Sequence, residues 1–365
     1  MRIPTPDIDS NLLATLVGGQ WRRTFASRKQ GGECVFVFNR QEDENDILVL
    51  RNDTVCPAAI DLRVPGFGLM SCHSFVNDPA LAGLQGVLED FQDYRVLRYR
   101  PGKRISLAAT HREHGPVIIK TVVRGSAEIF NRLRTVWGAR NHLDFSVSEP
   151  VACFPEANTF VQRCLTGVPI DFKHQEFDQA LIGRMARAVS SLHACGALFP
   201  YQFDVAAQRT RSVRYAHIIK SSIPESGNVV DRVFIELGLL ENRIRKLPLD
   251  LKPIHGSLHS HQWLRDGDKL ALVDFDRASM GHAELDIATF LAELDYESSA
   301  CGSAINGHFL NGCSGWDPTV LTYYRVHKHF AKAYKASKSP DPEIALGKTL
   351  RNLGQTLNLL TPGGR

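Results

Sequence analysis

Histidines, an amide and two carboxylates lie close together in the second half of the chain, with a spacing that suits a metal ion bound to phosphate. His255 and His259 come first, Gln262 follows, and a turn and an apolar run then lead to Asp274 and Asp276. Carboxylate and amide oxygens are the hard ligands that a phosphate-bound Mg²⁺ takes in proteins. We therefore expect a nucleotide site at which Gln262 and Asp274 hold the metal ion.

A strand, a loop and a helix must position these groups. The apolar residues 270–273 predict a short buried strand, and a carboxylate at the end of such a strand faces a cleft. The loop with the histidines precedes this strand. Asp286 follows it, inside an apolar segment with helical spacing.

This stretch resembles the catalytic core of the aminoglycoside phosphotransferase and choline kinase superfamily. The family pattern is H-G-D-x-H-x-x-N, then a strand ending in D-x-D, then G-x-x-x-x-D-L-A. Its counterparts here are His255-Gly256-Ser257-Leu258-His259-Ser260-His261-Gln262, then Asp274-Phe275-Asp276, then Gly281 with Asp286-Ile287-Ala288. The resemblance implies an α+β, two-lobed protein-kinase-like fold, with a small β-rich N-lobe and a large, mostly helical C-lobe. It also implies ATP-dependent phosphoryl transfer to a hydroxyl of a small molecule, with ATP and Mg²⁺ as cofactors.

One residue departs from the family pattern at the position that matters most for catalysis. Ser257 stands where the family has its catalytic Asp, which orients the acceptor hydroxyl and accepts its proton. A serine hydroxyl at neutral pH is a poor general base unless another group activates it. Because the transition state is loose and positioning dominates, turnover can survive this change. The candidate catalytic residues are Ser257 itself, with His259 or Asp276 in the role of the missing base.

Two functions of different class follow from this pattern. The first is an active kinase that phosphorylates a small-molecule hydroxyl acceptor. The second is a catalytically inactive pseudokinase that binds nucleotide or a protein partner. A zinc site built from His255, His259, His261 and Asp274 is a further interpretation. Against zinc, two of these histidines fall on positions that are histidine throughout the family pattern.

The small lobe is readable from residue 94 onward. Residues 94–100 and 104–109 alternate in polarity around a Pro-Gly turn, which predicts a β-hairpin. Lys120 ends the next apolar run and resembles the strand lysine of kinases, which contacts nucleotide phosphates and pairs with an acid on the following helix. Glu128, in the first turn of that helix, is its expected partner.

Two further strands are expected at residues 150–154 and 158–164, before a turn at Gly167. This arrangement resembles the hinge between the lobes of the family, where adenine binds to main-chain groups. By that resemblance, the backbone at Gln162 and Cys164 would contact the base.

The resemblance and the spacing together suggest a domain division. Residues 1–90 form an N-terminal extension or the first part of the N-lobe, residues 91–165 the nucleotide-binding N-lobe, and residues 166–365 the helical C-lobe with the catalytic loop and metal site. Within the first part, strands are expected at residues 33–38 and 46–51, a loop at 57–74 and a helix at 78–90. In the C-lobe, helices are expected at residues 176–194, 208–219, 231–246, 318–335 and 342–359.

Composition limits the remaining possibilities. A hydrophobic content of 43% over 365 residues is enough for a large core, and a net charge of +4 without a dense basic block argues against nucleic acid as a partner. Eight scattered cysteines with no C-x-x-C pair suggest thiols in a reducing compartment. No signal peptide and no apolar run of transmembrane length is seen. We therefore expect a cytoplasmic protein that does not bind membranes.

Overall fold

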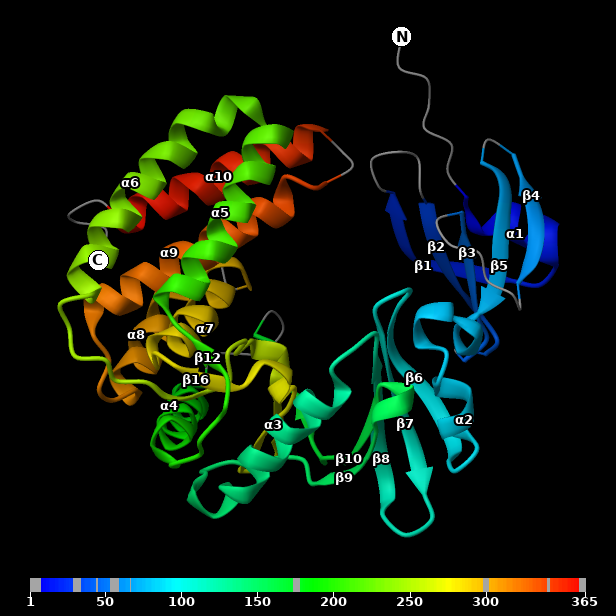
Figure 1. Ribbon diagram of the computed structural model, residues 1–365, viewed down its shortest axis with the longest axis horizontal. Helices are drawn as coiled ribbons and strands as arrows, with labels where there is room; N and C mark the ends of the chain where they lie inside the picture. Colours follow the sequence, from blue (N-terminus) through cyan, green and yellow to red (C-terminus); the bar gives the residue numbers. More distant parts are fainter. Residues whose placement is uncertain are drawn as a thin grey trace. The chain divides into compact units, whose positions relative to one another are not determined.

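The chain divides into two units, each with its own core. In this computed structural model the first unit comprises Met1–Asn131 and Glu149–Cys164, and the second comprises Arg132–Ser148 and Leu165–Arg365. Figure 1 shows the first unit rich in strands and the second rich in helices. The structure describes residues 8–28, 34–43, 45–52, 59–65, 67–172, 178–297, 302–339 and 342–360.

The first unit begins with a helix and a five-stranded antiparallel sheet. Its elements are α1 (Ser10–Val17), β1 (Trp21–Arg28), β2 (Cys34–Arg40), β3 (Ile47–Arg51), β4 (Ile60–Val64) and β5 (Gly68–Ser74), with strand order β1-β2-β3-β5-β4. The expected strands at 33–38 and 46–51 correspond to β2 and β3. The expectation of a loop at 57–74 is wrong, because β4 and β5 lie there. Their alternation, with Val64 and Met70 buried, is hidden in sequence by the surrounding Gly and Pro.

A second five-stranded antiparallel sheet completes the first unit. Its strands are β6 (Gln92–Arg100), β7 (Arg104–His111), β8 (Gly115–Val122), β9 (Pro150–Phe154) and β10 (Thr159–Arg163), in the order β6-β7-β8-β10-β9. The expected hairpin is confirmed, since β6 pairs with β7 around Pro101 and Gly102. The buried faces of β7 and β8 contribute Ile105, Leu107 and Ile119 to a core that also includes α2 (Leu84–Leu88).

The single helix expected at 78–90 is instead two short pieces. A 3-10 turn at Pro79–Leu81, capped by the Asp78 carboxylate, precedes α2. Gly83 separates them and packs against the chain, because a Cβ on this residue would lie 2.4 Å from the Cα of Ala157. A side chain has no room there, so glycine is required where the chain passes from the 3-10 turn to α2.

Helices form the bulk of the second unit. They are α4 (Gln179–Ala194), α5 (Val205–Ser222), α6 (Gly227–Ile244), α7 (Glu284–Glu297), α8 (Gly302–Gly312), α9 (Pro318–Ala336) and α10 (Pro342–Leu360), while α3 (Ser126–Gly138) crosses the boundary between the units. The helices expected from spacing are confirmed, with differences of at most four residues at their ends. The sequence did not predict α8.

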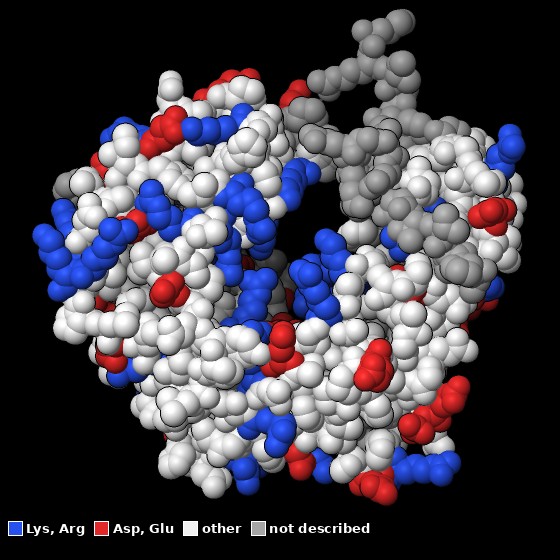
Figure 2. Space-filling model, viewed as in Figure 1, with Lys and Arg blue, Asp and Glu red and all other residues white. Residues whose placement is uncertain are grey.

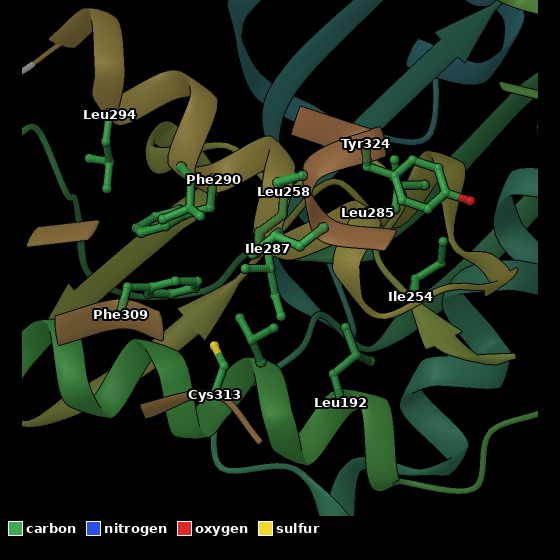
Figure 3. Close-up of a cluster of buried hydrophobic side chains, with 14 of the residues drawn as sticks. Leu192, Ile254, Leu258, Leu285, Ile287, Phe290, Leu294, Phe309, Cys313 and Tyr324 are labelled. Carbon is green, nitrogen blue, oxygen red and sulfur yellow. The ribbon is translucent and has the colours of Figure 1, made fainter. Parts of the chain in front are cut away.

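The core of the second unit surrounds α7 and α9. In α9, one face buries Tyr323, Tyr324 and Phe330 against α5, α6, α7 and α10. Figure 3 shows the part of this core beside α7, where Ile287 and Phe290 point toward side chains of other elements. α7 is buried on nearly all sides, and the residues 287–292 between its acids are apolar apart from Thr289.

Two small sheets carry the loops that matter for function. β11 (Val168–Pro169), β14 (Trp263–Asp266) and β15 (Lys269–Leu272) form one. β12 (Gln202–Phe203), β16 (Ser279–Gly281) and β13 (Lys252–Ile254) form the other. The expected strand at 270–273 corresponds to β15. The histidine loop therefore runs from β13 in one sheet to β14 in the other.

Charged side chains are spread over the surface in small groups. Figure 2 shows one group of Lys and Arg at the edge of the helical unit where α6 ends, a region in which Arg243, Arg245 and Lys246 are exposed. Across the described parts of the chain, none of the helices combines the length and the apolar character needed to cross a membrane.

Candidate active site

A buried carboxylate on α7 holds the start of the histidine loop. Asp286, which is 0% exposed, accepts hydrogen bonds from the backbone N–H groups of His255 at 2.7 Å and Gly256 at 2.8 Å. The His193 side chain lies 3.3 Å from the same carboxylate. Burial alone would raise the pKa of Asp286, but the hydrogen bonds from His193 and His255 lower it below its usual value. Asp286 is therefore ionised, and it fixes where the loop leaves β13.

His255 joins the loop to the strand that ends at Asp274. Its ring Nε2 lies 3.0 Å from the carbonyl oxygen of Val273. Burial lowers the pKa of His255, so the ring is neutral and its Nε2–H donates to that carbonyl. His255, at a position where the family pattern also has histidine, therefore links the loop to the end of β15.

Gly256 and Leu258 shape the loop between its anchors. Gly256 has φ +75°, and a Cβ there would lie 2.4 Å from the carbonyl oxygen of Arg277, so only glycine fits. Leu258 is 0% exposed, and Figure 3 shows its side chain beside Ile287 and Phe290 of α7. The two residues on either side of Ser257 are therefore held by backbone geometry and by the core.

Ser257 and His259, both proposed from sequence as catalytic, are brought together. Ser257 Oγ lies 3.1 Å from His259 Nε2. The other ring nitrogen, Nδ1, lies 3.3 Å from Glu293 Oε1, and Glu293 Oε2 lies 3.5 Å from Lys332 Nζ. Burial by itself would raise the pKa of Glu293, but the hydrogen bond to His259 and the Lys332 ammonium lower it to about 2. Glu293 is therefore a carboxylate under all ordinary conditions.

The low pKa of Glu293 gives a testable dependence of stability on pH. An acid with a lowered pKa in the folded state stabilises the protein above its unfolded pKa of 4.5, and this stabilisation is lost as pH falls toward about 2. We expect wild type to exceed Glu293→Gln in free energy of unfolding by up to about 3 kcal/mol at pH 7. Urea unfolding at several pH values should show the difference shrinking below pH 4.5. A difference that stays constant down to pH 3 would contradict the assignment.

Gln262 and Asp274, the expected metal ligands, also lie together. Gln262 Oε1 accepts the backbone N–H of His259 at 2.8 Å, and its Nε2 donates to Asp274 Oδ2 at 3.3 Å. Asp274 has φ +73°, a left-handed conformation that Asp and Asn adopt more readily than most residues other than glycine. The Gln262 amide is turned with its nitrogen toward Asp274, and its oxygen would serve a metal ion in addition to the bond from His259. This donor set fits Mg²⁺, which needs one or two protein oxygens beside phosphate and water.

Asp276 lies two residues further on, in the 3-10 turn Phe275–Arg277. Its backbone carbonyl accepts a hydrogen bond from Arg132 of α3, and its side chain is half-buried. Phe275 anchors this turn, because its ring is buried and stacks on Phe145. The turn thus carries one acid on each side of a fixed aromatic ring.

The residues expected to bind nucleotide from the N-lobe lie in the first unit. Lys120 is on β8, with its ammonium 5.8 Å from the ring of Phe160, and Glu128 is exposed in the first turn of α3. Gln162 is buried on β10, opposite Ile118. The backbone N–H of Cys164 donates to the carbonyl of Pro116 at 2.9 Å, so this N–H already serves the sheet.

One interpretation of the sequence does not hold. Within the residues that the structure describes, no three His, Cys, Asp or Glu side chains are placed to share a metal ion, so the zinc interpretation is wrong. Two acids near the end of α7 are engaged in ion pairs. Glu293 is paired as above, and Asp295 binds Arg325 and His329 at 3.0 Å each.

The role of Glu293 was missed, although the sequence contains a signal for it. Glu293 follows Asp286 by seven residues on the same helix, which places both on one face of α7. Because Asp286 faces the histidine loop, a carboxylate two turns later should face the same loop. The pairing of Glu293 with His259 in particular depends on the path of the loop.

Comparison with known proteins identifies the family of the chain. Residues 134–322 match the sequence model of the phosphotransferase enzyme family. The match spans just over half of the 365 residues, and the chain belongs to this family. A search of curated proteins found no match.

Solved structures with the same fold come from small-molecule kinases. A choline/ethanolamine kinase family protein from Mesorhizobium loti is 16% identical, with a TM-score of 0.56 over 77% of this chain and 96% of that one. Choline kinase LicA from Streptococcus pneumoniae is 15% identical, with a TM-score of 0.54 over 74% and 95%. A Ralstonia eutropha protein assigned to the aminoglycoside phosphotransferases is 13% identical, with a TM-score of 0.54 over 76% and 97%. The expected α+β, protein-kinase-like fold is thereby confirmed.

Proposed function

We propose that the chain is an ATP-dependent phosphotransferase that acts on a hydroxyl of a small molecule and uses Mg²⁺. Membership of the family supports phosphoryl transfer to a small molecule. The observation that carries the proposal is the Gln262–Asp274 pair, in which the Asp274 carboxylate lies one hydrogen bond from the Gln262 amide just after the end of β15.

The remaining candidate residues would each bind a different part of the two substrates. Lys120, supported by Glu128, would contact the nucleotide phosphates, and main-chain groups at Gln162 and Cys164 would contact the base. Asp274 and Gln262 would hold Mg²⁺, with Asp276 as a further oxygen ligand. When bound, Mg²⁺ would neutralise the charge that develops on the transferred phosphoryl group. The acceptor hydroxyl would lie near Ser257.

We also propose a cytoplasmic location. Cys72, Cys153, Cys195 and Cys313 are thiols rather than disulfides. Burial raises the pKa of Cys72 to about 11 and that of Cys313 to about 12, so both are inert. Thiols of this kind are usual in a reducing compartment.

The proposed function is tested by ADP formation and product analysis. Purified protein is incubated with Mg²⁺ and ATP, either alone or with choline, ethanolamine or kanamycin as three chemically different acceptors. We expect ADP formation above the rate without acceptor for at least one compound, and mass spectrometry should find a phosphate on that compound. Asp274→Ala should lose this activity, and Asp268→Ala, whose side chain is 95% exposed, should keep it.

The result also decides between the proposed enzyme and its alternative. Nucleotide binding without any ADP formation would favour a catalytically inactive pseudokinase that binds nucleotide or a protein partner. ADP formation that survives Asp274→Ala would contradict the assigned metal site.

A further inference from the structure

Three side chains form a hydrogen-bonded line from the catalytic loop to α7. Ser257 Oγ lies 3.1 Å from His259 Nε2, and His259 Nδ1 lies 3.3 Å from Glu293 Oε1. Ser257 occupies the position of the family's catalytic carboxylate. We propose that Ser257, His259 and Glu293 form a relay that replaces this carboxylate and accepts the proton of the acceptor hydroxyl. This inference rests on the proposed function and adds Glu293 to its machinery.

The direction of each hydrogen bond follows from the chemistry of the groups. A carboxylate only accepts hydrogen bonds, so the bond between Glu293 and His259 requires a proton on Nδ1. The side chain of His259 also lies near the backbone N–H of Gln262, and that N–H donates to the carbonyl oxygen of His259 at 3.2 Å. In a neutral imidazole with this tautomer, Nε2 carries the lone pair. The Ser257 hydroxyl therefore donates to Nε2. Its oxygen then keeps lone pairs for the proton of an acceptor hydroxyl.

The transfer balances without any additional reactant beyond ATP and the acceptor. As the acceptor oxygen forms its bond to the γ-phosphorus, the bond between that phosphorus and the ADP oxygen breaks. The acceptor proton passes to Ser257 Oγ, and the Ser257 proton passes to His259 Nε2. The imidazolium so formed is stabilised by Glu293 and returns its proton to solvent after the product leaves. Ser257 is the catalytic residue of this relay, and His259 and Glu293 act through it.

The surroundings of Glu293 keep the relay in place. Its second oxygen lies 3.5 Å from Lys332 Nζ on α9, so each carboxylate oxygen has a partner. Lys328 and Lys335 of the same helix also interact electrostatically with this carboxylate, and His255 interacts with His259. Carboxylates oriented in this way commonly fix the tautomer of a histidine. The arrangement follows the logic of a nucleophile or acid-base group whose histidine is oriented by a third residue.

The tautomer of His259 can be measured without nucleotide or acceptor. Long-range ¹H–¹⁵N NMR of the full chain reports which ring nitrogen carries the proton, and the spectrum of His259→Gln identifies the signal. We expect the proton on Nδ1 in the wild type. A proton on Nε2 alone would overturn the relay, because no lone pair would then face Ser257.

Kinetics of ATP hydrolysis with Mg²⁺, with water as the acceptor, provide the second test. We expect Ser257→Ala and His259→Gln each to lower kcat by about 100-fold, with KM for ATP changed by less than about threefold. Groups that act as a unit are not additive, so the double variant should be no slower than the slower single variant. Glu293→Gln should lower kcat by about tenfold. His261→Gln, an exposed histidine of the same loop, is the matched control and should leave kcat unchanged.

The outcomes separate this inference from the proposed function. A wild-type protein that forms no ADP from ATP would contradict the proposed function. A wild-type protein that forms ADP at a rate unaffected by His259→Gln would overturn the relay alone. Phosphate found on Ser257 by mass spectrometry would also overturn it, because the serine would then be a nucleophile rather than a proton carrier.

Discussion

Replacing Asp286 by alanine is expected to lower the free energy of unfolding by about 3–5 kcal/mol. The carboxylate is 0% exposed and accepts two backbone N–H groups of the loop, with His193 as a third partner. Removing it leaves buried donors without partners, and each such donor costs about 1–3 kcal/mol. The loop that carries Ser257 would lose its anchor at the same time, so turnover should fall together with stability.

Urea unfolding of the wild type and variant measures this effect. Asp286→Asn keeps one oxygen for the N–H groups and should lie between the two. Asp268→Ala is the matched control, because that carboxylate is 95% exposed and its pairing with Arg184 is worth little. A loss below about 1 kcal/mol for Asp286→Ala would show that the loop does not depend on this anchor.

Gly256→Ala is expected to be the second most damaging change. Two penalties act together at this position, namely the φ of +75° and the 2.4 Å approach of the new Cβ to the carbonyl oxygen of Arg277. The backbone conformation alone costs about 1 kcal/mol for alanine. Overpacking against rigid backbone adds about 1–3 kcal/mol. Because the clash also moves the residue next to Ser257, kcat should fall in the folded fraction of the variant.

Gly267→Ala isolates the contribution of the clash. Gly267 also has a positive φ, +58°, but a Cβ there meets nothing within 4 Å. This control should therefore lose only the conformational part, about 1 kcal/mol. Thermal or urea unfolding of both variants gives the comparison. Equal losses at the two positions would contradict the close packing of Gly256 against Arg277.

The fold was predictable from sequence where the pattern is strong and local. The β6–β7 hairpin and α9 follow from alternation and helical spacing, which depend on neighbouring residues only. The region of β4 and β5 was not predictable, because Gly and Pro interrupt its alternation. The helix expected at 78–90 is divided at Gly83, and the close approach of Ala157 to this glycine is a tertiary contact that no local pattern records.

In the candidate site too, contacts between residues joined by a short segment were predictable, and the contact between distant segments was not. Ser257 lies close to His259 because the two residues are separated by one residue of the same loop. Gln262 lies close to Asp274 because the hairpin of β14 and β15 connects them. The contact of Glu293 with His259 joins a loop to the middle of a helix, and it requires the rotation of α7 about its axis to be known. That rotation follows from the burial of Ile287 and Phe290, whereas the pairing itself depends on the path of the histidine loop.

Calorimetric titration of ATP, with and without Mg²⁺, tests the central claim that this site binds a metal–nucleotide complex. We predict that Mg²⁺ strengthens binding of ATP to the wild type by at least about tenfold, which is 1.4 kcal/mol. Asp274→Ala should abolish this dependence on Mg²⁺, and Asp268→Ala should retain it. Absence of ATP binding to the wild type, or an unchanged Mg²⁺ dependence in Asp274→Ala, would contradict the account.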